Sequence, residues 1–325
     1  MRLKLTAILL AGLTIAAQAE PITLTTSAIS GFQSFSTAID FGPLSWRGGV
    51  QLTSSDESFG GLSGLSLSAD CTSLLAVSDT GKWLRAKIGY DGETLAGLSD
   101  TEYAPILDSA GNPPKSKVRA DAEALTALGS GRYMVGFESR TRVGFYDIGK
   151  SGLKARFQLL KSPKSITEGP ANGELESVGR ITHGPWKNHY LAISERNTDA
   201  DGNIRGWLWQ LSKTVPFTIK QFEDYNITDA AVLNNGDVLI LERSFGRSYL
   251  PGMAIRRFKS AAIRSGSTVA PELVFSGHAP FYAIDNMEGI AICQRGGETR
   301  LTIISDNNLN TLLQRTLLLQ FAYKP

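Results

Sequence analysis

Short apolar runs alternate with polar residues and tight turns along almost the whole chain. In residues 64–68 leucines alternate with serines, the period of two that is typical of a strand with one buried face. The same plan of run, turn and run recurs at residues 124–138 and 230–242, where the turns are rich in glycine, serine and asparagine. Helical periodicity is nearly absent. The pattern therefore predicts an all-β chain of short strands.

Five successive units each open on a small motif and close on an apolar run that ends in a carboxylate. The openings are centred on Ser63, Glu123, Glu176, Asp229 and Glu288, and the closings end at Asp79, Glu138, Glu195, Glu242 and Asp306. Taken as equivalent, the openings are 60, 53, 53 and 59 residues apart. A period of this size, with three or four short strands in each unit, indicates a β-propeller.

The unit that opens at Glu288 is short of a final strand, which bears on how the ring closes. Residues 316–323 are a strongly apolar strand near the C-terminus, and residues 46–53 could supply the missing strand from the N-terminus. Closure of this kind removes free sheet edges. We therefore expect five blades closed by N- and C-terminal strands; six blades stay open if residues 20–45 form more than an extension. Residues 100–117 and 161–172 are expected to be links between blades.

The first 19 residues are typical of a secretory signal peptide. Arg2 and Lys4 precede an apolar stretch that ends in Ala17-Gln18-Ala19, a small-x-small cleavage site. We expect cleavage near Ala19, a periplasmic or secreted destination, and a single propeller domain over residues 20–325. No later segment reaches the roughly 18 consecutive apolar residues of a membrane-spanning helix.

The net charge of the chain gives no indication of nucleic-acid binding. Of 33 basic and 31 acidic residues, removal of residues 1–19 takes two basic ones, so the mature chain is balanced and no basic face for nucleic acid is indicated. We expect a monomer that acts on a small molecule.

Cys71 and Cys293 lie in the first and last units, which a closed ring makes neighbours. In an oxidising compartment they could form a disulfide; two separate, partly buried thiols are the alternative.

Several segments together resemble one known family. They read GGVQL at 48–52, FGGLSGL at 59–65, SDTG at 78–81, DAEAL at 121–125, ELE at 174–176, SER at 194–196, NMEGI at 286–290, SDNN at 305–308 and QRTLLLQF at 314–321. Over almost the whole mature sequence the chain resembles the phytase-like family of secreted bacterial proteins, often described as having esterase-like activity. The resemblance implies a β-propeller and, by analogy with calcium-dependent propeller phytases, hydrolysis of phosphate esters.

The repeated carboxylates are the candidate metal ligands. Inner strands line the channel of a propeller, so their first residues should meet at one mouth, with Glu174 close behind the ring. Crowded carboxylates repel one another and are normally relieved by a cation, and oxygen ligands without histidine or cysteine favour Ca²⁺ or Mg²⁺. We expect calcium, held by Asp121, Glu123, Glu176, Asp229 and Glu288. The alternative is that each carboxylate caps backbone amides or pairs with an arginine of the next blade.

Arginines follow the closing carboxylates of three units and are candidates for binding substrate. Arg140, Arg196 and Arg243 could form an anion clamp beside the cation, with Lys82 and Arg247 as further members. Inter-blade salt bridges are the alternative.

A nucleophile is not evident in the sequence. Residues 61–64 lack the Gly-x-Ser-x-Gly spacing, and His183, His189 and His278 are the only histidines, although a Ser-His-Asp triad stays open. We therefore expect a phosphoric-ester hydrolase that uses metal-activated water, with Glu123, Glu176, Asp229 and Glu288 as catalytic candidates. The alternative is a non-catalytic periplasmic propeller that binds a ligand or protein partner and holds a structural calcium.

Overall fold

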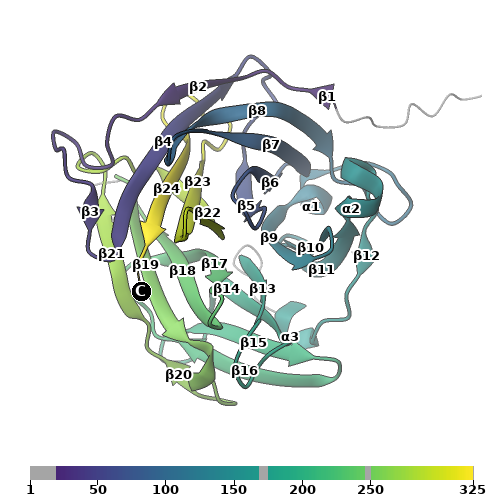
Figure 1. Ribbon diagram of the computed structural model, residues 1–325. Helices are drawn as coiled ribbons and strands as arrows, with labels where there is room; N and C mark the ends of the chain where they lie inside the picture. The colour runs from purple at the N-terminus through teal and green to yellow at the C-terminus, as the bar shows by residue number, and fades with distance from the viewer. Residues whose placement is uncertain (1–19, 168–174, 246–249, 325) are drawn as a thin grey trace, which may run out of the picture.

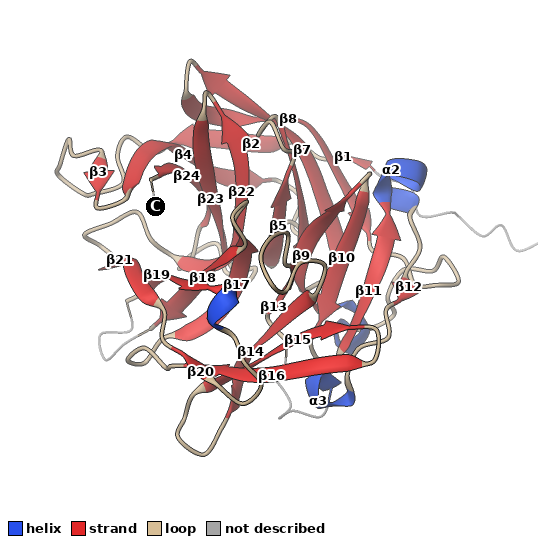
Figure 2. Ribbon diagram, turned by 60° about the horizontal axis from the view of Figure 1, so that its bottom comes forward, coloured by secondary structure: helices blue, strands red, loops and turns tan. Residues whose placement is uncertain are grey.

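Five β-sheets are arranged around a central axis like the blades of a propeller (Figure 1). The structure, a computed structural model, describes residues 20–167, 175–245 and 250–324. The prediction of an all-β propeller is confirmed, and the described residues form five blades. Figure 2 shows that strands make up nearly all of the ring, while the short helices α2 and α3 lie at its outer side.

Blades 1 and 2 come from the first half of the chain, and each starts with its innermost strand. Blade 1 consists of β5 (Leu62–Leu67), β6 (Ser73–Ser78), β7 (Lys82–Asp91) and β8 (Thr94–Pro105), with β1 (Glu20–Pro21) on its outer edge. Blade 2 consists of β9 (Ala122–Gly129), β10 (Arg132–Phe137), β11 (Arg142–Asp147) and β12 (Gln158–Leu159). The link expected at residues 100–117 starts later than predicted, because β8 continues to Pro105.

Blades 3 and 4 repeat this order from the inside outwards. Blade 3 consists of β13 (Ser177–Arg180), β14 (Tyr190–Thr198), β15 (Ile204–Gln210) and β16 (Lys213–Ile219), and β20 (Thr268–Val269) adds a parallel strand to its outer edge. Blade 4 consists of β17 (Asn226–Val232), β18 (Asp237–Ser244), β19 (Gly252–Lys259) and β21 (Glu272–His278). The helices are single turns: α1 (Lys117–Ala120), α2 (Ile148–Ser151), α3 (Lys164–Thr167), and 3₁₀ turns at Gly152–Lys154 and Ser260–Ala262.

Blade 5 is built from both ends of the chain, which closes the ring as predicted. Its strands are β22 (Asn286–Arg295), β23 (Glu298–Asp306), β24 (Thr316–Tyr323), β4 (Leu44–Ser54) and β2 (Leu24–Ala28), with β3 (Asp40–Phe41) paired to β4. The C-terminal β24 runs antiparallel to the N-terminal β4, with Leu318 opposite Val50 (Figure 1). All eight residues of β24 are buried, so its apolar side chains become part of the core.

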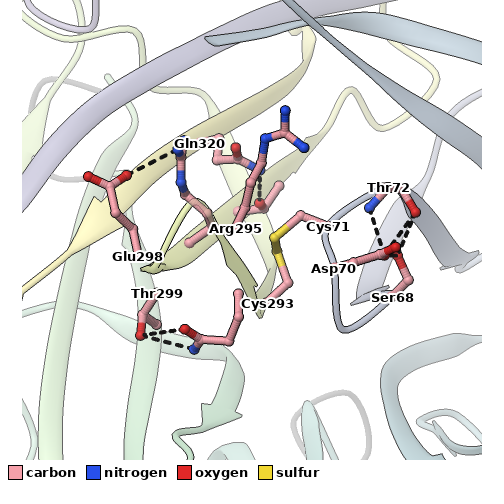
Figure 3. The surroundings of a disulfide bond; sticks show 12 residues. Ser68, Asp70, Cys71, Thr72, Cys293, Arg295, Glu298, Thr299 and Gln320 are labelled. Atoms are coloured by element: carbon pink, nitrogen blue, oxygen red, sulfur yellow. Dashed lines mark hydrogen bonds and ion pairs between the residues drawn. A yellow bond between two sulfur atoms is a disulfide. The ribbon is translucent and has the colours of Figure 1, made fainter. Parts of the chain in front are cut away.

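A disulfide adds a covalent tie between the first and last blades. Cys71 lies in the turn after β5 and Cys293 lies in β22, and their sulfur atoms are bonded with a Cα–Cα distance of 5.3 Å (Figure 3). Both cysteines are buried. The bond joins residues 222 positions apart in the sequence and lies between inner strands that the ring makes neighbours.

The inner strands approach each other closely, which explains two glycines of the opening motifs. A Cβ atom on Gly64 would lie 2.6 Å from the backbone nitrogen of Leu125, and one on Gly289 would lie 2.2 Å from the carbonyl oxygen of Ser63. Glycine therefore leaves room for the backbone of the neighbouring inner strand. Apolar side chains fill the space between blades; Leu75, Trp83 and Val135, for example, belong to one cluster that joins blades 1 and 2.

The predicted signal peptide, residues 1–19, lies outside the described residues. Among the residues that are described, no helix is long and apolar enough to cross a membrane.

Candidate metal centre at the mouth of the ring

The openings and closings of the repeats meet at one end of the ring axis, which we call the mouth. In each blade the first two strands are antiparallel, so the second strand ends where the inner strand begins. Phe137 is opposite Ala122 in blade 2, and Ser305 is opposite Met287 in blade 5. The carboxylates that follow these closing residues therefore lie beside the carboxylates of the openings.

Two openings contain a β-bulge whose extra residue is a glutamate. Between β9 and β10 the register shifts at Glu123, and between β22 and β23 it shifts at Glu288. A bulge leaves one residue unpaired and changes the direction of its side chain, and bulges are frequent beside functional sites. The local backbone therefore presents Glu123 and Glu288 differently from the other side chains of their strands.

Five carboxylates from blades 2 and 3 form two overlapping groups. Asp121, Glu123 and Glu138 make one group, and Glu138, Glu176 and Glu195 make the other. Within each group, one carboxylate oxygen from each residue lies within 4.8 Å of the others. Glu138 belongs to both groups. Such clusters are spaced so that they could bind a metal ion.

Neighbouring residues fix the position of Asp121. Its Oδ2 accepts a hydrogen bond from the backbone N–H of Ser139 at 3.0 Å and another from the Ser139 hydroxyl group. Its Oδ1 lies 3.5 Å from the ammonium of Lys117, which also contacts Asp79 Oδ2 at 2.5 Å. Lys117, at the start of α1, partly offsets the negative charge on this side of the mouth.

Burial and mutual repulsion raise the pKa values of the central carboxyl groups. Burial raises the pKa of Glu123 well above its usual value, and the charge of Asp121 raises it further. Burial likewise raises the pKa of Glu176, with added repulsion from Glu123, Glu195 and Glu138. Ionisation of these carboxyl groups is therefore disfavoured, because the described side chains do not fully compensate the negative charge that it would create.

Asp229 is not part of either group, because blade 4 is shifted by one residue relative to the predicted repeat. Ile227 is opposite Glu242, so the extra residue of the bulge is Thr228 rather than Asp229. The Asp229 carboxylate instead accepts the backbone N–H of Ala230 at 2.8 Å and that of Ile290 in blade 5 at 2.9 Å. Asp229 therefore caps backbone amides, which is the alternative to metal binding.

The same one-residue shift brings Arg243 to the mouth in place of a closing carboxylate. Its guanidinium donates to Glu288 of blade 5 and lies 3.4 Å from Glu195 of blade 3. Burial alone would lower the pKa of Arg243, but the charges of Glu288, Glu176 and Glu195 raise it above its usual value. Arg243 therefore forms inter-blade salt bridges, the alternative considered for the arginines, and Glu288 is engaged by this cation.

Glu242, the closing carboxylate of blade 4, points elsewhere. It forms a two-pronged ion pair with Arg256 of β19, with both N–O distances at 2.6 Å. Glu242 and Arg243 thus lie on opposite faces of β18, as expected for neighbouring residues of a strand.

The other predicted cations are not gathered into one clamp. Arg196 is exposed and its Nε lies 3.1 Å from Glu195, so it borders the second carboxylate group. Arg140 lines a pocket on blade 2, and the Lys82 ammonium lies over the ring of Tyr103, 5.0 Å from its centroid. Arg247 and Glu174 lie outside the described residues.

Sequence reasoning did not select Glu138 or Glu195 as metal ligands. Both residues are closings of the repeats in the sequence. Because the first two strands of a blade are antiparallel, the end of the second strand lies beside the start of the first, and this rule predicts that the closings lie beside the openings. Among the described residues, none of the three histidines belongs to either carboxylate group.

A family model described as "Phytase-like: Esterase-like activity of phytase" matches residues 57–309. No curated protein matches the chain.

Solved structures match the chain at low sequence identity. The α-L-arabinofuranosidase PaAbf62A from Podospora anserina, in complex with cellotriose, is 10% identical, with a TM-score of 0.50, and the match covers 83% of this chain and 93% of that one. The RS223 β-xylosidase is 10% identical, with a TM-score of 0.46 and coverage of 82% and 94%. The Dos1 propeller is 11% identical, with a TM-score of 0.36 and coverage of 86% and 75%. At this identity the likeness concerns the fold alone.

Proposed function

The chain belongs to the phytase-like family, and from this premise we propose that it is a calcium-dependent hydrolase of phosphate esters. The observation that carries the proposal is the pair of carboxylate groups at the mouth, joined by Glu138. The proposed metal ligands are Asp121, Glu123, Glu138, Glu176 and Glu195.

The donor chemistry fits a hard divalent cation. All five residues offer carboxylate oxygens, the ligands that Ca²⁺ prefers, and neither group contains histidine or cysteine. Burial raises the pKa values of Glu123 and Glu176 most, and the neighbouring carboxylates raise them further. A bound cation would offset that repulsion. When bound, calcium would supply Lewis-acid activation of a phosphoryl oxygen and of water.

The chain's own residues would supply positioning, charge and proton transfer. Ser139 and Lys117 hold Asp121, and Arg243 holds Glu195. Arg196 has 57% of its side chain exposed next to Glu195 and is placed to donate hydrogen bonds to a phosphate group. Burial raises the pKa of Glu288 to about 8, so this carboxyl group can hold or release a proton near neutral pH.

A second candidate is a binding propeller in which calcium is structural. It is favoured by the origin of the second carboxylate group, because Glu138 comes from blade 2 whereas Glu176 and Glu195 come from blade 3. A cation held there would cross-link two blades without any chemistry.

Secretion and domain organisation belong to the same proposal. We place the mature chain, residues 20–325, outside the reducing cytoplasm as a monomeric single domain. The Cys71–Cys293 disulfide supports an oxidising compartment, and the joining of both chain ends in blade 5 supports one domain.

The test is hydrolysis of p-nitrophenyl phosphate, phytate and p-nitrophenyl acetate by purified residues 20–325, with Ca²⁺ or with EDTA. Glu138→Gln removes the shared carboxylate, and Glu272→Gln changes an exposed glutamate of the outer strand β21 as a matched control. We expect calcium-dependent phosphate release that falls roughly tenfold or more in Glu138→Gln only, since even outer-shell changes have effects of this size.

Two other results would redirect the proposal. Cleavage of the acetate ester that is indifferent to EDTA would indicate a serine nucleophile. No hydrolysis at all, with calcium raising only the melting temperature, would favour the binding propeller.

A further inference from the structure

A pocket of about 570 Å³ lies on blade 2, beside the mouth but outside the carboxylate groups. The link that leads from β8 to β9 forms one wall, and the end of β10, the start of β11 and Phe157 form the other. Ala120 and Phe137 line it, and the residues that follow them, Asp121 and Glu138, belong to the first carboxylate group. A volume of this size accommodates a small organic molecule.

The charged side chains around this pocket are almost all positive. Lys115, Arg119, Arg140 and Arg142 line it, against a single carboxylate, Asp108. Asp108 is already used in a turn, because its Oδ1 accepts the backbone N–H groups of Ala110 and Asn112 at 2.9 and 2.8 Å. The pocket therefore has an excess of positive charge, in contrast to the mouth next to it.

Arg119 and Arg140 are exposed, and within the described part of the chain their guanidinium groups have no hydrogen bond or ion pair. Guanidinium groups are suited to two-pronged binding of phosphate and carboxylate. Two such groups that share one pocket and lack protein partners are available to an anionic ligand.

Arg142 joins the backbone segments that carry the two exposed arginines. Its guanidinium donates to the carbonyl oxygen of Arg119 at 2.5 Å and to that of Arg140 at 3.0 Å. It also lies over the ring of Phe137, 3.7 Å from the centroid. Burial lowers the pKa of Arg142, and the charges of Arg140 and Arg119 lower it further, which reflects crowding of positive charge that an anion would relieve.

Aromatic rings form the apolar wall of the same pocket. Phe157 packs against Phe137 with ring centroids 5.8 Å apart, and against Tyr146 at the same centroid distance. Rings in this arrangement favour edge or offset contact with a further planar ring. The lining thus combines the partly exposed ring of Phe157, which the buried rings of Phe137 and Tyr146 support, with cationic side chains.

We propose that this pocket binds a small organic anion, an aromatic ring that carries a phosphate or carboxylate group. The anionic group contacts Arg119 and Arg140, and the ring lies against Phe157, because Phe137 is buried beneath the guanidinium of Arg142. Positive charge and aromatic surface together select this class over a bare inorganic ion or a neutral aromatic compound. The site is separate from the proposed metal centre and does not depend on the proposed hydrolysis.

The test is calorimetric titration of residues 20–325 in EDTA with phenyl phosphate, benzoate, inorganic phosphate and phenol. EDTA removes any cation from the mouth, whose carboxylates then repel anions. We expect one-to-one binding of phenyl phosphate and benzoate, and binding of inorganic phosphate and of phenol at least tenfold weaker. In the double variant Arg119→Gln, Arg140→Gln the binding of phenyl phosphate should weaken at least tenfold.

Arg132→Gln is the matched control, because this exposed arginine begins β10 and thus lies at the opposite end of the strand from the pocket. It should bind phenyl phosphate as the unmodified protein does. The proposal is overturned if the unmodified protein does not bind either aromatic anion in EDTA, or if the double variant binds them equally well. Binding that appears only with Ca²⁺ would place the anion at the metal centre instead, and would support the proposed function while refuting this pocket.

Discussion

The backbone N–H of Glu138 donates to the carbonyl oxygen of Asp121 across 2.9 Å. This bond joins the end of β10 to the residue before β9, and it brings together carboxylates that are 17 positions apart in the sequence. Glu138 is thereby placed between Asp121 and Glu123 of its own blade and Glu176 and Glu195 of the next. The centre of the candidate site is a closing residue of a repeat rather than an opening one.

Replacement of Glu138 by glutamine should weaken calcium binding more than replacement of any other single carboxylate of the five. Both groups lose a charged ligand, whereas Glu195→Gln affects only the second group. We expect at least a tenfold rise in the calcium dissociation constant, measured by calorimetry. Glu272→Gln should bind like the unmodified protein. Equal affinity in Glu138→Gln would exclude these groups as the calcium site.

Asp229→Ala should reduce stability and leave calcium affinity unchanged. The side chain accepts the N–H groups of Ala230 and Ile290, and the second of these bonds joins blades 4 and 5. A buried N–H that loses its acceptor destabilises a protein by about 1–3 kcal/mol. Urea unfolding would measure the loss, and calcium titration of the folded variant would check the site. A calcium affinity that fell with Asp229→Ala would return this residue to the set of ligands.

Stability in EDTA should fall as the pH rises through the pKa values of the buried carboxyl groups. Burial raises the pKa of Asp306 from 3.8 to about 6, so the folded state binds this proton more tightly than the unfolded state does. The stabilisation from the proton is present below about pH 4 and is lost by about pH 6. A shift of this size corresponds to at most about 3 kcal/mol.

The variant Asp306→Asn isolates this contribution. Its free energy of unfolding, measured by urea titration in EDTA, should depend less on pH between about pH 4 and 6 than that of the unmodified protein. Glu272→Gln should retain the full dependence. Identical profiles for Asp306→Asn and the unmodified protein would rule out Asp306 as the source.

Removal of the Cys71–Cys293 disulfide should lower the free energy of unfolding, while the folded protein keeps its five blades. The bond closes a loop with a sequence separation of 222 and joins blades 1 and 5, where β4 and β24 also close the ring. Loss of such a cross-link costs roughly 2–5 kcal/mol, mainly through the entropy of the unfolded chain. Urea unfolding of the double variant Cys71→Ser, Cys293→Ser against the oxidised protein measures it. Equal midpoints would show that the strand closure alone sets the stability.

The local sequence pattern was sufficient to predict the strands and their grouping into blades. The run at 316–323 became β24 with the same bounds, and residues 46–53 lie inside β4 and close the ring. Alternation and turn residues act over a few positions, so they can be read without knowledge of the rest of the chain. The candidate site was predictable only in part: Asp121, Glu123 and Glu176 were selected and are brought together, whereas Glu138 and Glu195 were not selected.

The sequence by itself determined the strand period, the five units, the family and the presence of acidic residues at four of the five openings. Tertiary structure decided which of these residues meet. Because side chains of a strand alternate between faces, the one-residue shift in blade 4 turned Asp229 toward backbone amides and brought Arg243 to the mouth. The partners of Arg243 lie in blades 3 and 5, and contacts between blades depend on the packing of the whole ring rather than on any local pattern.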